Sequence, residues 1–249
     1  SVYFSLSDDA AFVKAEKTGT VMALQPVEVP YFDLALYGLE AYSMPAGSSD
    51  SGKPTMLHLY IYATEVFYYG LDAEEAGKGY LADQIGGPVF KVSGSPGSIF
   101  MEKLWGMDSN MAYYNNYQFP LYPGTTTGAT ADRVVLHDGD VVTIGHFSNW
   151  SFYNDPASVF NYMVIGADSE GGTQDKDQTV TLKVYRAGND MGTGGANTPV
   201  IGQPEIYYTL TNTLSSGDVT TWTKLGKADA NGCLEVALSD LPSGSYLFA

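Results

Sequence analysis

The sequence predicts a mainly β protein, with a small α+β domain at the N-terminus and a β-sandwich domain at the C-terminus. Charged residues make up only 16% of the 249 residues, while Gly (28) and Tyr (19) are frequent, a composition typical of secreted β-rich proteins. Short apolar alternations recur from residue 89 onward. A polar segment rich in Gly and Asp, at residues 168–177, separates two groups of them.

The N-terminal part begins with two predicted strands. Val2–Ser7 and Thr20–Pro30 alternate apolar and polar residues, as half-buried strands do. The segment Pro45–Pro54 is rich in Gly, Ser, Asp and Pro, so we expect a loop there.

The next segment, residues 56–69, fits two patterns. A strand would have the alternating apolar residues Leu57, Leu59 and Ile61, and a helix would have the apolar stripe Leu59, Ala63, Val66 and Phe67. We favour a helix, because Thr55 can cap its start and Gly70 can end it. A run of about 14 residues is also long for a strand. A capping-box pattern at Asp72 allows a second short helix.

Strand patterns dominate the rest of the first predicted domain, residues 1–167. Its further predicted strands are Val89–Val92, Ser98–Leu104, Met111–Tyr114, Arg133–Leu136, Asp140–Phe147 and Ser158–Ile165. Residues 168–177 contain no apolar side chain, so we expect a linker. Residues 178–249 hold five more strand-like segments between Gly, Pro and Asn turns, which fit an Ig-like or prealbumin-like sandwich.

Charge and cysteine content limit the classes of partner. The formal net charge is −16, from 12 basic and 28 acidic residues, which argues against nucleic acid and anionic membrane surfaces as partners. Solubility explains such acidity by itself, and calcium binding is the functional alternative. Cys233 is the one cysteine, so no internal disulfide can form, as is common both in the cytosol and at a Gram-positive cell surface. We expect Cys233 to be a small buried apolar residue.

Membrane insertion is not expected, because no apolar run approaches the roughly 18 residues of a membrane span. Ser1 is not a start Met and the chain ends within a strand-like pattern, so we expect a piece of a longer protein.

No catalytic pattern is apparent. His58, His137 and His146 occur in no metal-ligand spacing, and no nucleophile-elbow, Walker-type or dinucleotide-binding glycine motif is present. His137 and His146 flank one predicted strand, but a structural role is the simpler interpretation. We therefore expect no enzyme activity, no catalytic residue, no cofactor and no bound metal.

The segment His137–Asp140 reads His-Asp-Gly-Asp. Asp-Gly is the leading signal for a two-residue hairpin turn, which is how we interpret it. In the alternative interpretation its carboxylates bind calcium, but the full EF-hand spacing is missing.

Aromatic residues form the strongest functional signal. The candidate ligand-binding residues are Trp105, Tyr113, Tyr114, Trp150, Phe152 and Tyr153. Tyr and Trp present large rigid faces with polar tips, which suit sugar rings or extended peptides. The alternative is packing in a domain core: alternation along a strand sends Tyr113 and Tyr114 to opposite sides, so about half of the set must be core.

Several pieces of the first domain form a recognisable set. They are Lys53–His58, Gly106, Tyr113, Tyr114, Asn115, Asn116, His137, Asp138, Gly139, Asp140 and Trp150. Over Leu34–Met163 this set resembles the transcobalamin-like C-terminal domain, a domain of unknown function in surface proteins of anaerobic gut bacteria. The resemblance implies an extracellular α+β domain. Cobalamin binding does not follow, because that fold is shared more widely than the activity.

The tail contains a second set of turn and strand residues: Asp229, Asn231, Gly232, Leu241, Pro242, Gly244 and Tyr246. Over Val180–Ala249 it resembles collagen-adhesin B-type repeats, which are stalk modules. Some of these repeats carry a Lys–Asn isopeptide bond, and Lys183 lies where the reactive lysine would lie. The acceptor would follow the last strand, so we infer no bond within this chain.

Two functions remain open. The first is a non-enzymatic, extracellular cell-surface fragment for adhesion or ligand display, with a glycan or a matrix protein as partner. The second is a carrier module for a small ligand, either cobalamin-like or a glycan.

Overall fold

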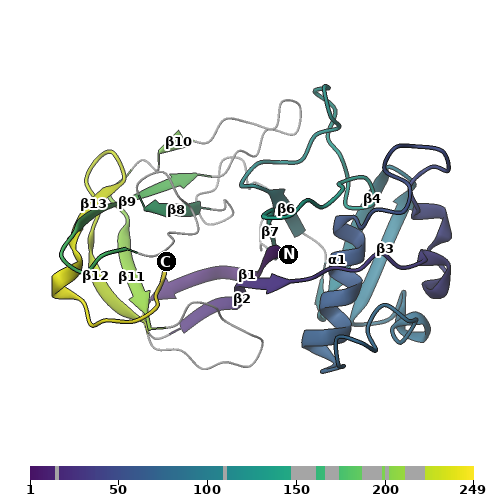
Figure 1. The fold of residues 1–249 in the computed structure, drawn as a ribbon, viewed down its shortest axis with the longest axis horizontal. Coiled ribbons are helices and arrows are strands. Elements are labelled where there is room, and N and C mark those ends of the chain that lie inside the picture. Colours follow the sequence, from purple (N-terminus) through teal and green to yellow (C-terminus); the bar gives the residue numbers. More distant parts are fainter. Residues whose placement is uncertain are drawn as a thin grey trace.

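The computed structural model describes most of the chain, namely residues 1–14, 17–108, 111–146, 161–165, 174–186, 198–199, 202–210 and 222–249. The protein is mainly β, as its composition predicts. The described residues form four small sheets of mostly antiparallel strands and one helix of more than two turns (Figure 1).

The first sheet brings together strands from distant parts of the sequence. Its order is β2-β1-β7-β6, with β1 at Val2–Lys14, β2 at Lys17–Val27, β6 at Met111–Asn115 and β7 at Val141–His146. The strands β1 and β7 are parallel, and the other pairs are antiparallel. Val2, Phe4 and Leu6 are buried at every second position, so the predicted alternation is confirmed.

The ambiguous segment is a helix, as its caps predicted. Helix α1 (Met56–Ala63) continues into a π-helical turn, η3 (Thr64–Tyr68). At its start the backbone N–H of Thr55 donates to His58 Nδ1 at 3.1 Å, and at its end Gly70 adopts φ +73°. All eight residues of α1 are buried, which explains why no clean helical stripe was visible in the sequence.

The second sheet packs on the same core as the helix. Its order is β3-β4-β5, with β3 at Phe90–Ser95, β4 at Ser98–Leu104 and β5 at Met107–Asp108. Short 3₁₀ helices also lie in this half of the chain: η1 at Leu34–Tyr37, η2 at Glu40–Tyr42 and η4 at Ala82–Gln84. One core joins both sheets through α1, with Phe4, Tyr60 and Leu104 among its fully buried members.

Two local predictions in this half are wrong. Arg133–Leu136 forms no strand, because its backbone bonds to the start of the helix: Met56 N–H donates to Val134 O at 2.9 Å. No second helix follows Asp72, where a single hydrogen-bonded turn forms. Gly77 ends that turn at φ +79°, a left-handed conformation.

The C-terminal part contains the remaining two sheets. One has the order β10-β9-β13, with β8 also paired to β9; the bounds are β8 Asn161–Ile165, β9 Thr179–Arg186, β10 Thr198–Pro199 and β13 Cys233–Ala237. The other has the order β12-β11-β14, with β11 at Glu205–Thr209, β12 at Thr223–Lys227 and β14 at Leu247–Phe248; η6 is at Leu238–Asp240. Both sheets contribute to one core that includes Leu182, Ile206 and Val236.

Contacts cross the predicted domain boundary. Strand β8, inside the predicted first domain, pairs with β9 of the predicted second domain. Trp222 and Leu247 are buried, and Ala23 and Leu24 of β2 pack against them. Residues 168–173 of the expected linker lie outside the described residues, so the boundary itself stays a prediction.

Candidate ligand-binding site

A buried carboxylate anchors the loop of residues 70–81. Glu65 is fully buried, and its Oε1 accepts hydrogen bonds from the Tyr37 hydroxyl (2.9 Å) and from Leu81 N–H (2.9 Å). Its Oε2 accepts from Gly77 N–H at 2.6 Å. Gly79 N–H donates in turn to the Tyr37 hydroxyl oxygen at 3.1 Å. A buried carboxylate needs such donors. Two of these four bonds join the loop to Glu65 directly, and a third joins it to Tyr37.

The anchor keeps the tyrosine hydroxyl as a donor. Burial raises the pKa of Tyr37 far above its usual value, and the charge of Glu65 adds to this. The phenol therefore stays protonated at neutral pH and continues to donate to Glu65. The loop backbone is thus hydrogen-bonded at Gly77, Gly79 and Leu81 to this buried pair.

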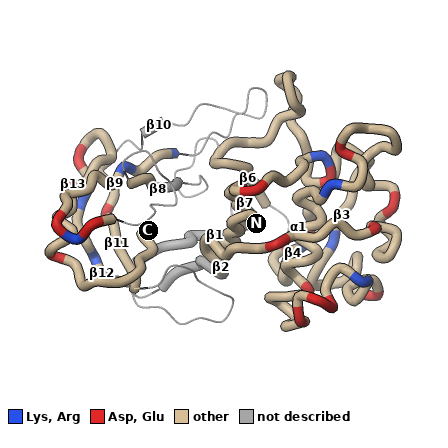
Figure 2. The backbone as a smooth tube through the Cα atoms, in the orientation of Figure 1, with Lys and Arg blue, Asp and Glu red and all other residues tan. Residues whose placement is uncertain are grey.

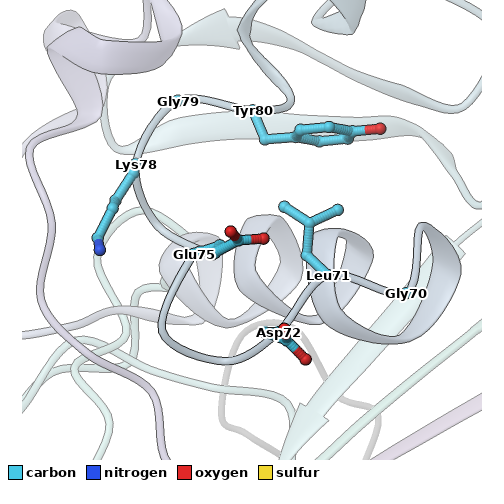
Figure 3. Close-up of a pocket in the computed structure, with 7 residues that line it drawn as sticks. All are labelled: Gly70, Leu71, Asp72, Glu75, Lys78, Gly79 and Tyr80. Atoms are coloured by element: carbon cyan, nitrogen blue, oxygen red, sulfur yellow. The ribbon is translucent and has the colours of Figure 1, made fainter.

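An open pocket of about 740 Å³ lies along this loop. It is lined by Gly70, Leu71, Asp72, Glu75, Lys78, Gly79 and Tyr80 (Figure 3). The Leu71 side chain points toward the Tyr80 ring, and the Glu75 carboxylate points into the same space. The ends of Lys78 and Asp72 point away from that space. The pocket therefore combines two apolar walls with one inward carboxylate.

Three tyrosines form a row beside the pocket, which we call the tyrosine face: Tyr68, Tyr69 and Tyr80. Tyr68 and Tyr80 are 42% and 50% exposed. The ring centroid of Tyr69 lies 5.0 Å from that of Tyr68 and 5.5 Å from that of Tyr80, in edge-on contacts. The Tyr69 hydroxyl donates to the Gln84 side-chain oxygen. The consecutive tyrosines before Gly70 were a visible signal that our sequence analysis did not use.

The described members of the predicted aromatic site lie in the interior. Trp105, Tyr113 and Tyr114 are only 8%, 9% and 1% exposed. Trp105 Nε1–H donates to Thr64 Oγ1 at 3.0 Å, and its ring centroid lies 5.9 Å from that of Tyr68. Trp105 thus packs against Tyr68 of the tyrosine face from the interior, while Tyr113 and Tyr114 are packed away from solvent.

The other three predicted members, Trp150, Phe152 and Tyr153, lie outside the described residues. As a ligand-binding set, the six residues therefore stay a prediction.

The histidines lie apart from this site. His58 is buried, and burial lowers its pKa to about 4. Because its Nδ1 accepts from Thr55, the neutral ring carries its proton on Nε2, which donates to Phe32 O at 3.1 Å. His137 is exposed and His146 half-buried. In the part of the chain that the structure describes, no three His, Cys, Asp or Glu side chains are grouped so that they could hold a metal ion.

The His-Asp-Gly-Asp segment forms a turn but not a hairpin. Asp140 N–H donates to His137 O at 3.1 Å, and Gly139 has φ +85°. The predicted hairpin is wrong because no strand precedes the turn, and β7 pairs with β1 and β6 instead. The Asp140 carboxylate has a structural partner, because it accepts a hydrogen bond from Asn116 Nδ2 at 2.8 Å.

Two further expectations concerned the burial of Cys233 and membrane insertion. Cys233 lies on β13 and is half-buried, so its thiol is less enclosed than we expected. No helix among the described residues is both long enough and apolar enough to cross a membrane.

None of the protein-family models, curated proteins and solved structures compared with this chain matches it. The two family resemblances therefore stay predictions, and the candidate site rests on its own geometry.

Proposed function

We propose that this chain is a non-enzymatic extracellular module for adhesion or ligand display at a cell surface, and that it binds through the tyrosine face and the adjoining pocket. One observation carries the proposal. Tyr80, which is 50% exposed, lines an open pocket on a loop that the buried Glu65 holds in place. Tyr68, which is 42% exposed, extends the same row of rings through Tyr69. Exposed aromatic groups of this kind are typical of binding surfaces.

The physical advantage of this arrangement is preorganisation. A tyrosine ring offers a large contact area with few rotatable bonds, so little entropy is lost when it meets a ligand. The loop backbone is already ordered by the Glu65 bonds to Gly77 and Leu81, which removes a further ordering cost. Both effects favour binding without any chemical step.

The C-terminal part supplies a spacer in this proposal. Two sheets share the core around Leu182 and Ile206, an arrangement that supports an Ig-like or prealbumin-like sandwich. The resemblances to collagen-adhesin B-type repeats and to the transcobalamin-like domain support the same placement at a cell surface. The partner would be an extracellular glycan or a matrix protein.

A small-ligand carrier is the second candidate. The pocket volume of about 740 Å³ favours it, because small-molecule pockets commonly measure about 300–1,000 Å³. The pocket is open to solvent, however, which suits a surface that displays a ligand better than a carrier that encloses one. Saturable quenching of tryptophan fluorescence by cobalamin would support the carrier.

Arrays of extracellular glycans and matrix proteins test the main proposal. We expect Tyr80→Ala to weaken the hits about fivefold or more, because it removes a stacking ring worth about 1 kcal/mol. Tyr31→Ala is the matched control, since Tyr31 is also 50% exposed but does not line the pocket. Hits that survive both Tyr80→Ala and Tyr68→Ala unchanged would show that the tyrosine face is not the binding surface.

A further inference from the structure

We infer that the pocket beside the tyrosine face receives an arginine side chain from a basic segment of a partner protein. The inference rests on the proposed binding function and names the chemistry of its ligand. It depends on the composition of the pocket walls, on the charge of the loop, and on the length of the tyrosine row.

The pocket walls match the two properties of a guanidinium group. The group is planar and stacks on aromatic rings, and its N–H fork fits a carboxylate. In Figure 3 the Tyr80 ring and Leu71 form the apolar walls, and the Glu75 carboxylate lies beside Leu71 at the edge of the space between them. A guanidinium in this space can stack on the ring and donate to Glu75 at the same time.

The loop charge favours a cationic ligand. The loop at residues 70–81 contains three acidic residues and one lysine, a formal charge of −2; the acidic residues are Asp72, Glu74 and Glu75. Within the described part of the chain, none of these carboxylates is in an ion pair. Lys78 lines the pocket, but its ammonium group points away from Glu75 (Figure 3).

The net negative charge of the whole chain also favours a cationic ligand. Figure 2 shows acidic positions spread over both halves of the molecule, and the chain carries a formal charge of −16. The electric field of such a charge raises the association rate of basic partners and repels acidic ones.

The tyrosine row indicates a peptide segment and not a free amino acid. Its three rings continue past the pocket, with successive centroids 5.5 and 5.0 Å apart. Residues that flank the arginine can lie along Tyr69 and Tyr68, which adds contact area beyond the pocket. A neutral saccharide could also stack on these rings, but it would make no use of the unpaired carboxylates.

Titration of the isotope-labelled protein, followed by NMR chemical shifts, tests this inference. The probe is a short Gly/Ser peptide that carries two arginines, and its counterpart carries citrulline, which has the same shape without the charge. We expect the arginine peptide to shift the backbone signals of residues 70–81 saturably and to bind at least fivefold more tightly than the citrulline peptide. We expect Glu75→Gln to weaken binding about fivefold.

Glu74→Gln is the matched control, because it removes the same charge one residue away, from a side chain that does not line the pocket. An equal loss of affinity in Glu74→Gln and Glu75→Gln would mean that only the net negative charge of the loop matters, and it would overturn the inference. Equal affinity for both peptides would also overturn it.

A neutral oligosaccharide series separates this inference from the proposed function. If oligosaccharides bind in a manner that depends on Tyr80 and the arginine peptide does not, the function stands and the arginine assignment fails. If neither ligand depends on Tyr80, the proposed function itself fails.

Discussion

Replacing Glu65 with glutamine removes one carboxylate oxygen from the anchor of the loop at residues 70–81. In the protein, Oε1 accepts from Tyr37 and Leu81, and Oε2 accepts from Gly77 at 2.6 Å. The glutamine carbonyl can keep the first two bonds. Its NH₂ group must then face the Gly77 N–H, so that two donors meet in a fully buried place.

The expected loss of stability follows from this one bond. A hydrogen bond to a charged group contributes about 1.5–3 kcal/mol, and a buried donor left without a partner costs about 1–3 kcal/mol. Some of this loss is offset, because a buried charge is removed at the same time. We therefore expect Glu65→Gln to lower the free energy of unfolding by about 2–3 kcal/mol. Glu65→Ala removes every bond and leaves a cavity, so we expect about 4 kcal/mol or more.

Urea unfolding followed by circular dichroism measures these losses, with Glu75→Gln as the exposed control that we expect to change stability by less than about 0.5 kcal/mol. The same Glu65→Gln protein should also bind more weakly at the tyrosine face, because its loop is less ordered. A Glu65→Gln protein as stable as the wild type would refute the reasoning. It would mean that burying the charge costs as much as its hydrogen bonds contribute.

Two further predictions concern pH and backbone conformation. The pKa of His58 is about 4 in the folded protein and about 6.5 when unfolded, so the unfolded state takes up the proton first as pH falls. Stability is therefore lost between about pH 6.5 and pH 4, by about 3 kcal/mol in total, and His58→Asn should remove this part of the pH dependence in urea unfolding; an unchanged slope would contradict the assignment. Gly77→Ala should cost about 2–3 kcal/mol by thermal unfolding, because φ is +79° and a Cβ would lie 2.9 Å from Phe32 Cδ1. Gly86→Ala, at φ +82° with open space around it, should lose only the backbone share of about 1 kcal/mol, and equal losses would argue against the clash.

Strand positions were predictable because side-chain alternation is a local property. Ser98–Leu104 was predicted with the bounds that β4 has, and Met111–Tyr114 falls one residue short of β6. The helix at 56–69 was recovered from its caps, Thr55 and Gly70, and not from its burial pattern. Capping depends on neighbouring residues, so it can be recognised in the sequence.

The failed local predictions have causes that lie far away in the sequence. Arg133–Leu136 has strand-like composition, but its backbone is used by the start of α1, with Thr55 bridged to Val135. The pattern at Asp72 permits a helix, but Gly77 donates to Glu65, twelve residues earlier. The helix or strand propensity of a segment contains no information about hydrogen-bond partners that come close only when the whole chain folds.

The sequence by itself determined a mainly β fold, most of the described strands, the helix caps and a net negative charge, because each depends on composition or on neighbouring residues. Only the tertiary structure decided which aromatic rings reach solvent. Trp105, Tyr113 and Tyr114 are buried while Tyr68 and Tyr80 are exposed, although all five combine a large apolar ring with one polar group. Exposure depends on what packs against a ring, and here that is set by long-range contacts such as those of Glu65 with the loop at residues 70–81.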